Sequence, residues 1–206
     1  MRRKHDRILT LKYMNSITDF AHTEGIRSHM DGARLFVQSA HTGVPPAQYG
    51  EIFDTVYTSM WKCFNAPSGA ILAGSSAFTE GMFHERRMFG GGLPYAWPFA
   101  AIALHFVDGF IDDYKAAWAK AERIFDALEK NDRFRVEKFD DGTHVVRLNI
   151  QGADLKKFKQ SLQRRNVDIR NPDNEGIWLR INPSLNRKTV EEMAGHFSDA
   201  FKESAV

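Results

Sequence analysis

Two residues, an aspartate and a lysine, stand where their side chains could do chemistry together. Asp31 follows a short strand expected over 26–30 and precedes a glycine. Lys62 follows a second apolar run over 52–60 and precedes a third over 69–74. Because ligands of open α/β sheets bind beyond the ends of the strands, an acid and an amine placed this way predict one shared site at a sheet edge.

Lys62 has neighbours that are mostly apolar or small, TVYTSMW before it and CFNAPSGAILAG after it. A lysine amine in apolar surroundings is a usable nucleophile for a carbonyl carbon. The small-residue turn over 65–69 would let a flat ring lie against the backbone. The alternative is an ordinary exposed lysine in a loop.

Asp31 and Arg34 carry the charges that such a ring would need. A carboxylate against the ring nitrogen of pyridoxal phosphate (PLP) keeps that nitrogen protonated, so that the ring can act as an electron sink. The alternative, a turn aspartate that caps its own backbone, is equally open for Asp31. Arg34 could direct its planar guanidinium to a carboxylate or to the phenolate oxygen of the ring, or it could be solvated at the surface.

Arg180 lies in the otherwise apolar run IWLRIN at 177–182. A charge in such a strand needs a partner, because burying it unpaired costs free energy. The carboxylate of a substrate and an acid of the same domain are equally open as that partner.

The composition excludes several other classes of site. The eight histidines form no HExxH motif, and the one cysteine, Cys63, belongs to no cluster with metal-ligand spacing, so no metal site is predicted. The net charge of +2 is spread along the chain and gives no case for nucleic acid. No run approaches the ~20 apolar residues of a membrane span. The opening MRRKHDR has no apolar stretch behind it and is not a signal peptide, so we expect a cytoplasmic protein.

The elements that would position these residues follow an α/β rhythm. A helix over 8–24, the strands near 26–30, 52–60 and 69–74, and a helix over 76–88 indicate a sheet covered by helices, here a partial large domain over 1–93. A long helix over 94–130 carries one apolar stripe and connects to a second domain, with Gly109 marking a possible bend. Residues 131–206 form a small α+β domain with strands near 134–139, 144–150, 167–170 and 177–182, and helices that carry Phe158 and Phe197.

Three motifs together resemble the threonine aldolase and β-eliminating lyase family of PLP enzymes, which share the aspartate aminotransferase fold. They are HMDGARLF at 29–36, SMWKCFNAPSGAILAGS at 59–75 and RRMFGGGLPYAW at 86–97. The resemblance implies that Asp31 binds the pyridine nitrogen, that Lys62 attaches the cofactor, and that Arg34 and Arg180 hold the substrate carboxylate. It implies retro-aldol cleavage of a β-hydroxy-α-amino acid, of the threonine or phenylserine type, to glycine and an aldehyde in a dimer or tetramer.

The resemblance aligns only with the second half of the family. Trp61 stands where the family usually has a serine, and the triple glycine continues as Leu93-Pro94-Tyr95 instead of Met-Arg-Gln. The family's glycine-rich phosphate turn and its ring-stacking residue lie in the other half. A β-eliminating lyase, an aminotransferase or an inert fragment therefore stay open as alternatives.

Overall fold

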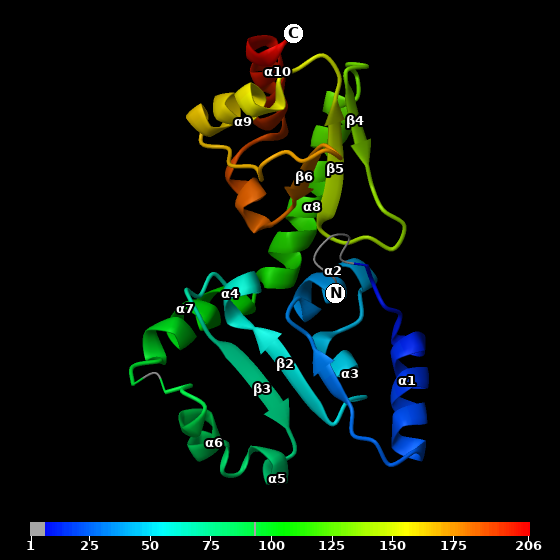
Figure 1. The fold of residues 1–206 in the computed structure, drawn as a ribbon, viewed down its shortest axis with the longest axis vertical. Helices are drawn as coiled ribbons and strands as arrows, with labels where there is room; N and C mark the ends of the chain where they lie inside the picture. Colours follow the sequence, from blue (N-terminus) through cyan, green and yellow to red (C-terminus); the bar gives the residue numbers. More distant parts are fainter. Residues whose placement is uncertain (1–6, 93) are drawn as a thin grey trace. The chain divides into compact units, whose positions relative to one another are not determined.

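The computed structural model describes residues 7–92 and 94–206, which divide into two compact units. The first unit spans Leu9–Ile111 and the second Asp112–Val206 (Figure 1). Ile8 groups with the second unit, since its amide donates a hydrogen bond to the carbonyl of Asp141 (2.6 Å). Each unit holds one small sheet with helices, so the predicted mixed α/β fold class is confirmed. No helix in the described ranges is both long and apolar enough to cross a membrane.

The first unit is built around a three-stranded sheet in the order β1-β2-β3. Strand β1 runs parallel to β2, with Asp31 opposite Tyr57, and β2 runs antiparallel to β3, with Ser59 opposite Ala70. The elements of this unit are α1 (Leu11–Thr23), β1 (His29–Asp31), α2 (Leu35–Thr42), α3 (Pro46–Gly50), β2 (Thr55–Ser59), α4 (Met60–Cys63), β3 (Ala70–Gly74), α5 (Ser76–Thr79), α6 (Met82–Met88) and α7 (Trp97–Val107).

A small core packs α1, β1, α2 and α3 together. Its buried members are Met14, Met30, Leu35 and Tyr49. Polar contacts fasten the ends of α1, where the hydroxyl of Thr10 accepts the amide of Tyr13 at 3.2 Å and so caps the helix.

Asp54 ties the last turn of α1 to the beginnings of β1 and β2. Its carboxylate accepts the amide (2.6 Å) and the hydroxyl (2.9 Å) of Ser28, and it pairs with the ring of His22 (3.0 Å). The backbone hydrogen bond from Ser28 is the largest of the contacts that hold the pKa of Asp54 well below its usual value.

The second unit has an antiparallel sheet in the order β4-β5-β6. One continuous core, centred on the fully buried Val146, Leu148, Phe158, Leu162 and Ile177, joins this sheet to the helices. The elements are the greater part of α8 (Phe110–Leu128), β4 (Phe134–Glu137), β5 (Val145–Ile150), α9 (Leu155–Arg164), β6 (Ile177–Arg180), the 3₁₀ helix η1 (Pro183–Arg187) and α10 (Val190–Ser204).

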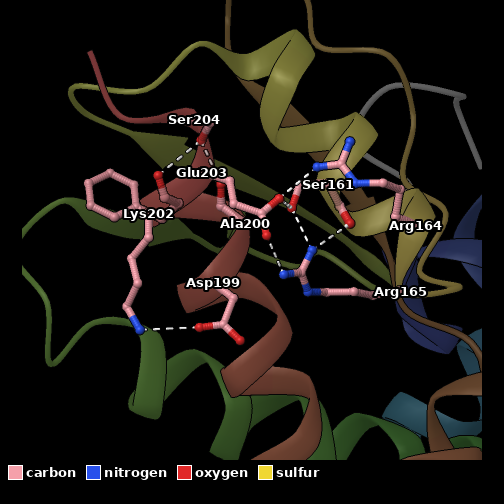
Figure 2. A network of polar contacts seen from close by, with 9 residues as sticks. Ser161, Arg164, Arg165, Asp199, Ala200, Lys202, Glu203 and Ser204 are labelled. Atoms are coloured by element: carbon pink, nitrogen blue, oxygen red, sulfur yellow. Dashed lines mark hydrogen bonds and ion pairs between the residues drawn. The ribbon is translucent and has the colours of Figure 1, made fainter.

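A polar network joins the two helices α9 and α10 (Figure 2). Glu203 of α10 accepts hydrogen bonds from Arg165 (2.5 Å), Arg164 (2.6 Å) and the hydroxyl of Ser161 (2.7 Å). The bond from Arg165 is the largest of the causes that lower the pKa of Glu203 to about 2. These contacts hold the ends of α9 and α10 together.

The structure corrects three details of the predicted elements. The single helix expected over 76–88 is two helices, α5 and α6, because Gly81 adopts a left-handed φ of 80° between them. The long helix expected over 94–130 is likewise divided into α7 and α8, and the break includes Gly109. The strand expected over 167–170 was wrong: Val167 and Ile169 bury their side chains, but the segment joins no sheet.

The two units divide at Ile111, inside the predicted connecting helix. The assignment of 1–93, 94–130 and 131–206 to a cofactor domain, a connector and a small domain stays a prediction.

Candidate active site

Asp31 and Lys62 lie at the same edge of the first sheet. Asp31 is the last residue of β1, and Lys62 lies in the one-turn helix α4, which begins directly after β2. Since β1 and β2 are parallel, both residues lie at the carboxyl ends of their strands, on the same side of the sheet. This is the arrangement that the sequence predicted.

The turn that carries Asp31 is fastened to β2 and α4 by three contacts. The amide of Gly32 donates to the carbonyl of Tyr57 (2.8 Å), and the Thr58 hydroxyl donates to the carbonyl of Gly32 (3.2 Å). The Cys63 sulfur lies 4.0 Å from the carbonyl oxygen of Ala33. The residue after Asp31 must be glycine for this approach, because a Cβ at position 32 would stand only 2.8 Å from the Tyr57 oxygen.

The Asp31 carboxylate makes one hydrogen bond within its own turn, and its second oxygen can accept another. Its Oδ1 accepts the amide of Ala33 at 3.2 Å, which is the turn-capping bond of the alternative reading. Within residues 7–92 and 94–206, its Oδ2 makes no hydrogen bond, and the residue is exposed. A single carboxylate can therefore close its turn and still accept a proton donor from a ligand.

Lys62 is half-buried, with its ammonium 5.1 Å from the centre of the Trp61 ring. It makes no hydrogen bond or ion pair to the described part of the chain. The turn that follows Lys62 is anchored by Phe64, whose ring packs edge-on against Phe36 (centroids 4.7 Å apart) and Phe110 (5.5 Å). The lysine is thus held on a fixed backbone while its amine stays available.

Cys63 next to the lysine is an unreactive thiol. Burial raises the pKa of Cys63 to about 12, and the positive charges of Arg34 and Lys62 oppose that rise only in part. Arg34 lies three residues after Asp31, directly before α2. Asp31, Arg34 and Lys62 all belong to the first unit, with Asp31 and Lys62 at the same sheet edge.

Arg180 belongs to the second unit. It is the last residue of β6, is half-buried, and lines a pocket of about 590 Å³ together with Asn182, Ser184 and Arg187. Its predicted part in holding a carboxylate stays a prediction.

Ser59 is a residue that the sequence reasoning missed. It is the last residue of β2 and is 0 % exposed, and its hydroxyl has no hydrogen-bond partner in the described part of the chain. An unsatisfied buried hydroxyl costs about 1–3 kcal/mol, so it calls for an explanation. The signal in the sequence is a hydroxyl side chain one helical turn before the candidate lysine, at the end of a strand.

These residues fit PLP at the atoms that the first unit supplies. An available amine can take the carbonyl carbon, a carboxylate with an unused oxygen can take the ring nitrogen, and Gly32 brings the two loops together.

A comparison with protein families agrees with this fit. The sequence model of the beta-eliminating lyase family matches residues 6–151. The chain belongs to the beta-eliminating lyase family. Enzymes of this family depend on PLP, so the predicted cofactor and the suspected family are both confirmed at this level.

Several relatives of this family member are described as threonine aldolases. The low-specificity L-threonine aldolase of Candida albicans is 30 % identical over 127 residues, which are 62 % of this chain and 34 % of the relative. A protein from Exiguobacterium sp. 255-15, whose description names an aromatic amino acid beta-eliminating lyase/threonine aldolase, matches in structure with a TM-score of 0.78 at 19 % identity. That match covers 97 % of this chain and 58 % of the Exiguobacterium chain. The threonine aldolase of Leishmania major matches with a TM-score of 0.64 at 14 % identity, over 94 % of this chain and 56 % of its own.

Each match covers a larger share of this chain than of the relative. The chain spans about a third of the Candida relative and somewhat more than half of each solved structure. The structural matches show the fold of the chain. It is the fold of the PLP-dependent enzymes, as the sequence predicted.

Proposed function

We propose that this chain acts in a PLP-dependent lyase that cleaves a β-hydroxy-α-amino acid to glycine and an aldehyde by retro-aldol chemistry. The observation that carries the proposal is the fastening of the Asp31 turn to the Lys62 helix. The contacts of Gly32 with Tyr57 and of Cys63 with Ala33 hold a carboxylate and an available amine at one sheet edge. The threonine aldolase relative from Candida albicans supports this proposal.

Each residue of the site has a role in this proposal. Lys62 attaches the cofactor through its amine, and Asp31 holds the proton on the pyridine nitrogen through its unused oxygen. Arg34 binds the substrate carboxylate with its planar guanidinium group, and Arg180 of the second unit is a second candidate for that role. The bound cofactor supplies an electron sink for the carbon that loses its bond. Ser59 offers a hydroxyl donor at the end of β2.

The first experiment asks whether Lys62 binds PLP. We expect a visible absorbance when PLP is added to the chain and, after reduction with borohydride, a label that peptide mapping places on Lys62. The Lys62→Ala variant should lose both signals. The matched control Lys12→Ala removes an exposed lysine of the same unit and should lose neither. A label spread over several lysines would contradict the proposal.

The second experiment separates the reactions that the family supports. We expect glycine and an aldehyde as products from threonine or phenylserine. Ammonia and a keto acid would indicate β-elimination or transamination instead, and would overturn the aldol proposal while leaving the PLP site intact. From the aromatic residues Trp61 and Tyr95 we expect phenylserine to be cleaved in preference to threonine, and equal rates on both substrates would contradict this expectation.

The third experiment tests Ser59. If its hydroxyl serves the cofactor, Ser59→Ala lowers PLP affinity while the free protein becomes no less stable, because a buried unsatisfied group has been removed. A variant that is destabilised and binds PLP normally would show that Ser59 only packs.

A further inference from the structure

The pocket of about 590 Å³ lies wholly within the second unit. Residues of α8, β6, η1 and α10 line it, together with the extended stretch 166–171 that joins no sheet. Its apolar lining includes Phe125 and Leu128 of α8 and Phe197 of α10. A pocket of this volume that combines apolar side chains with a few polar groups is typical of sites for small molecules.

The charged side chains around this pocket are mostly basic. Among the described residues, five basic side chains and one acidic side chain line it, namely Lys159, Asp168, Arg170, Arg180, Arg187 and Lys188. The carboxylate of Asp168 already accepts a hydrogen bond from the side-chain amide of Gln163 (3.0 Å). Within residues 7–92 and 94–206, the guanidinium groups of Arg170 and Arg187 make no hydrogen bond or ion pair. The pocket therefore offers two planar cationic donor groups to an anion.

The helix η1, which carries Arg187, is held in place by contacts with α8. The ammonium of Lys120 donates hydrogen bonds to the carbonyl oxygens of Lys188 (2.7 Å) and Asn186 (3.1 Å). The side-chain amide of Asn186 donates to the carbonyl oxygen of Asp113 (2.9 Å). Because this backbone is fixed by the protein's own contacts, little of its freedom remains to be lost when a ligand binds.

We infer that this pocket binds a small organic anion with an apolar body. Its phosphate or carboxylate head group pairs with Arg170 and Arg187, and its body lies against the apolar lining that includes Phe125. A neutral apolar molecule would leave the guanidinium groups unused, and an inorganic anion would leave the apolar lining unused. The inference goes beyond the proposed function, because the second unit supplies the whole pocket and Lys62 takes no part.

The test is isothermal titration calorimetry of the full chain without PLP. The probes are naphthyl phosphate, naphthoate, the neutral naphthol and inorganic phosphate. We expect the two organic anions to bind one to one, and naphthol and inorganic phosphate to bind at least about tenfold more weakly than the tighter of them. The tighter of the two organic anions identifies the head group. Added salt should weaken its binding, because the pairing is electrostatic.

Matched variants locate the bound anion. Arg187→Gln should weaken the binding of the tighter probe by about five- to tenfold, since it removes a charge-assisted hydrogen bond. Arg123→Gln, at an exposed position of the same unit outside the pocket, should bind as the wild-type protein does. Arg187 is also exposed, so circular dichroism should show that both variants stay folded. Lys62→Ala should bind the probe normally, because Lys62 belongs to the first unit.

Four results would overturn the inference. They are no binding of either organic anion, equal binding of naphthol, unchanged binding in Arg187→Gln, and loss of binding in Lys62→Ala. Competition by phenylserine would also overturn it, because the pocket would then be the substrate site through Arg180. The attachment of PLP to Lys62 is measured separately, so the anion pocket and the proposed function can fail independently.

Discussion

The sheets of the two units have the same number of strands but different cover. In the second unit, Ile177, Trp178 and Leu179 of β6 are all buried, at 0 %, 8 % and 7 % exposure. In the first unit, Ile71 and Leu72 of β3 are about half exposed. The helices α9 and α10 pack on each other and join one core with the second sheet, whereas the core of the first unit reaches α1, β1 and α2 and leaves β3 outside.

This difference separates stability from chemistry. The second unit has the core and the polar contacts that a domain needs to fold by itself. The first unit carries Asp31, Arg34 and Lys62, the residues proposed to hold the cofactor, on a sheet that is only partly covered. The first unit should therefore be less stable to unfolding than the second.

The largest expected effect comes from replacing one phenylalanine by alanine in each unit. Phe158→Ala removes a ring that is 0 % exposed from the second core, and should cost about 3–5 kcal/mol of unfolding free energy. Phe89→Ala removes a ring that is 87 % exposed, and should change stability by no more than about 0.5 kcal/mol. Denaturant unfolding of both variants measures the difference. Equal losses would show that Phe89 is buried in solution.

A pair of glycines gives the next largest effect. Gly32→Ala places a methyl group 2.8 Å from the Tyr57 carbonyl, and should cost about 1–3 kcal/mol and weaken PLP binding as the Asp31 turn shifts. Gly195→Ala lies in α10 with nothing within 4 Å of the added carbon, and should stabilise the helix by about 0.5–1 kcal/mol. Thermal unfolding with and without PLP separates the two, and a neutral Gly32→Ala would refute the close approach.

The helix caps offer a smaller comparison. Thr189 begins α10 with a capping box in which its hydroxyl accepts the amide of Glu192 and the Glu192 carboxylate accepts the amide of Thr189. Thr189→Ala should cost about 1 kcal/mol. Thr10 caps α1 with one bond, so Thr10→Ala should cost less. If Thr10→Ala lost more unfolding free energy than Thr189→Ala in chemical denaturation, the second unit would not be the more stable of the two.

The smallest expected effect concerns acid. The pKa of Glu203 is lowered to about 2 from its ordinary 4.5, so the unfolded chain binds the proton more readily than the folded one. The stability from this network is complete above pH 4.5 and is lost as the pH falls towards 2. The difference between the wild-type protein and Glu203→Gln should shrink over that window, measured as unfolding midpoints. Glu191→Gln, at an exposed position of the same helix, is the matched control.

The sequence was sufficient for the parts of the site that depend on strand order. Asp31 and Lys62 follow two apolar runs, and that alone predicted a shared edge. Ser59 could not be found this way, because burial and the lack of a hydrogen-bond partner are properties of the packed structure. The strand expected over 167–170 was wrong for a related reason. Val167 and Ile169 bury alternate side chains, and an extended segment that pairs with no other strand can show the same alternation. The position of the break between α7 and α8 was marked in advance by Gly109, whereas the break at Gly81 was not.

Cys63 offers a way to time the movements of the candidate site. It is the one thiol in the chain, and it is shielded where its sulfur touches the carbonyl of Ala33. Because Cys63 is buried, a thiol reagent should react with it only when the segments around it open. The rate of that reaction therefore measures how often Cys63 becomes exposed, and an ordinary colorimetric thiol reagent can measure it without any added label.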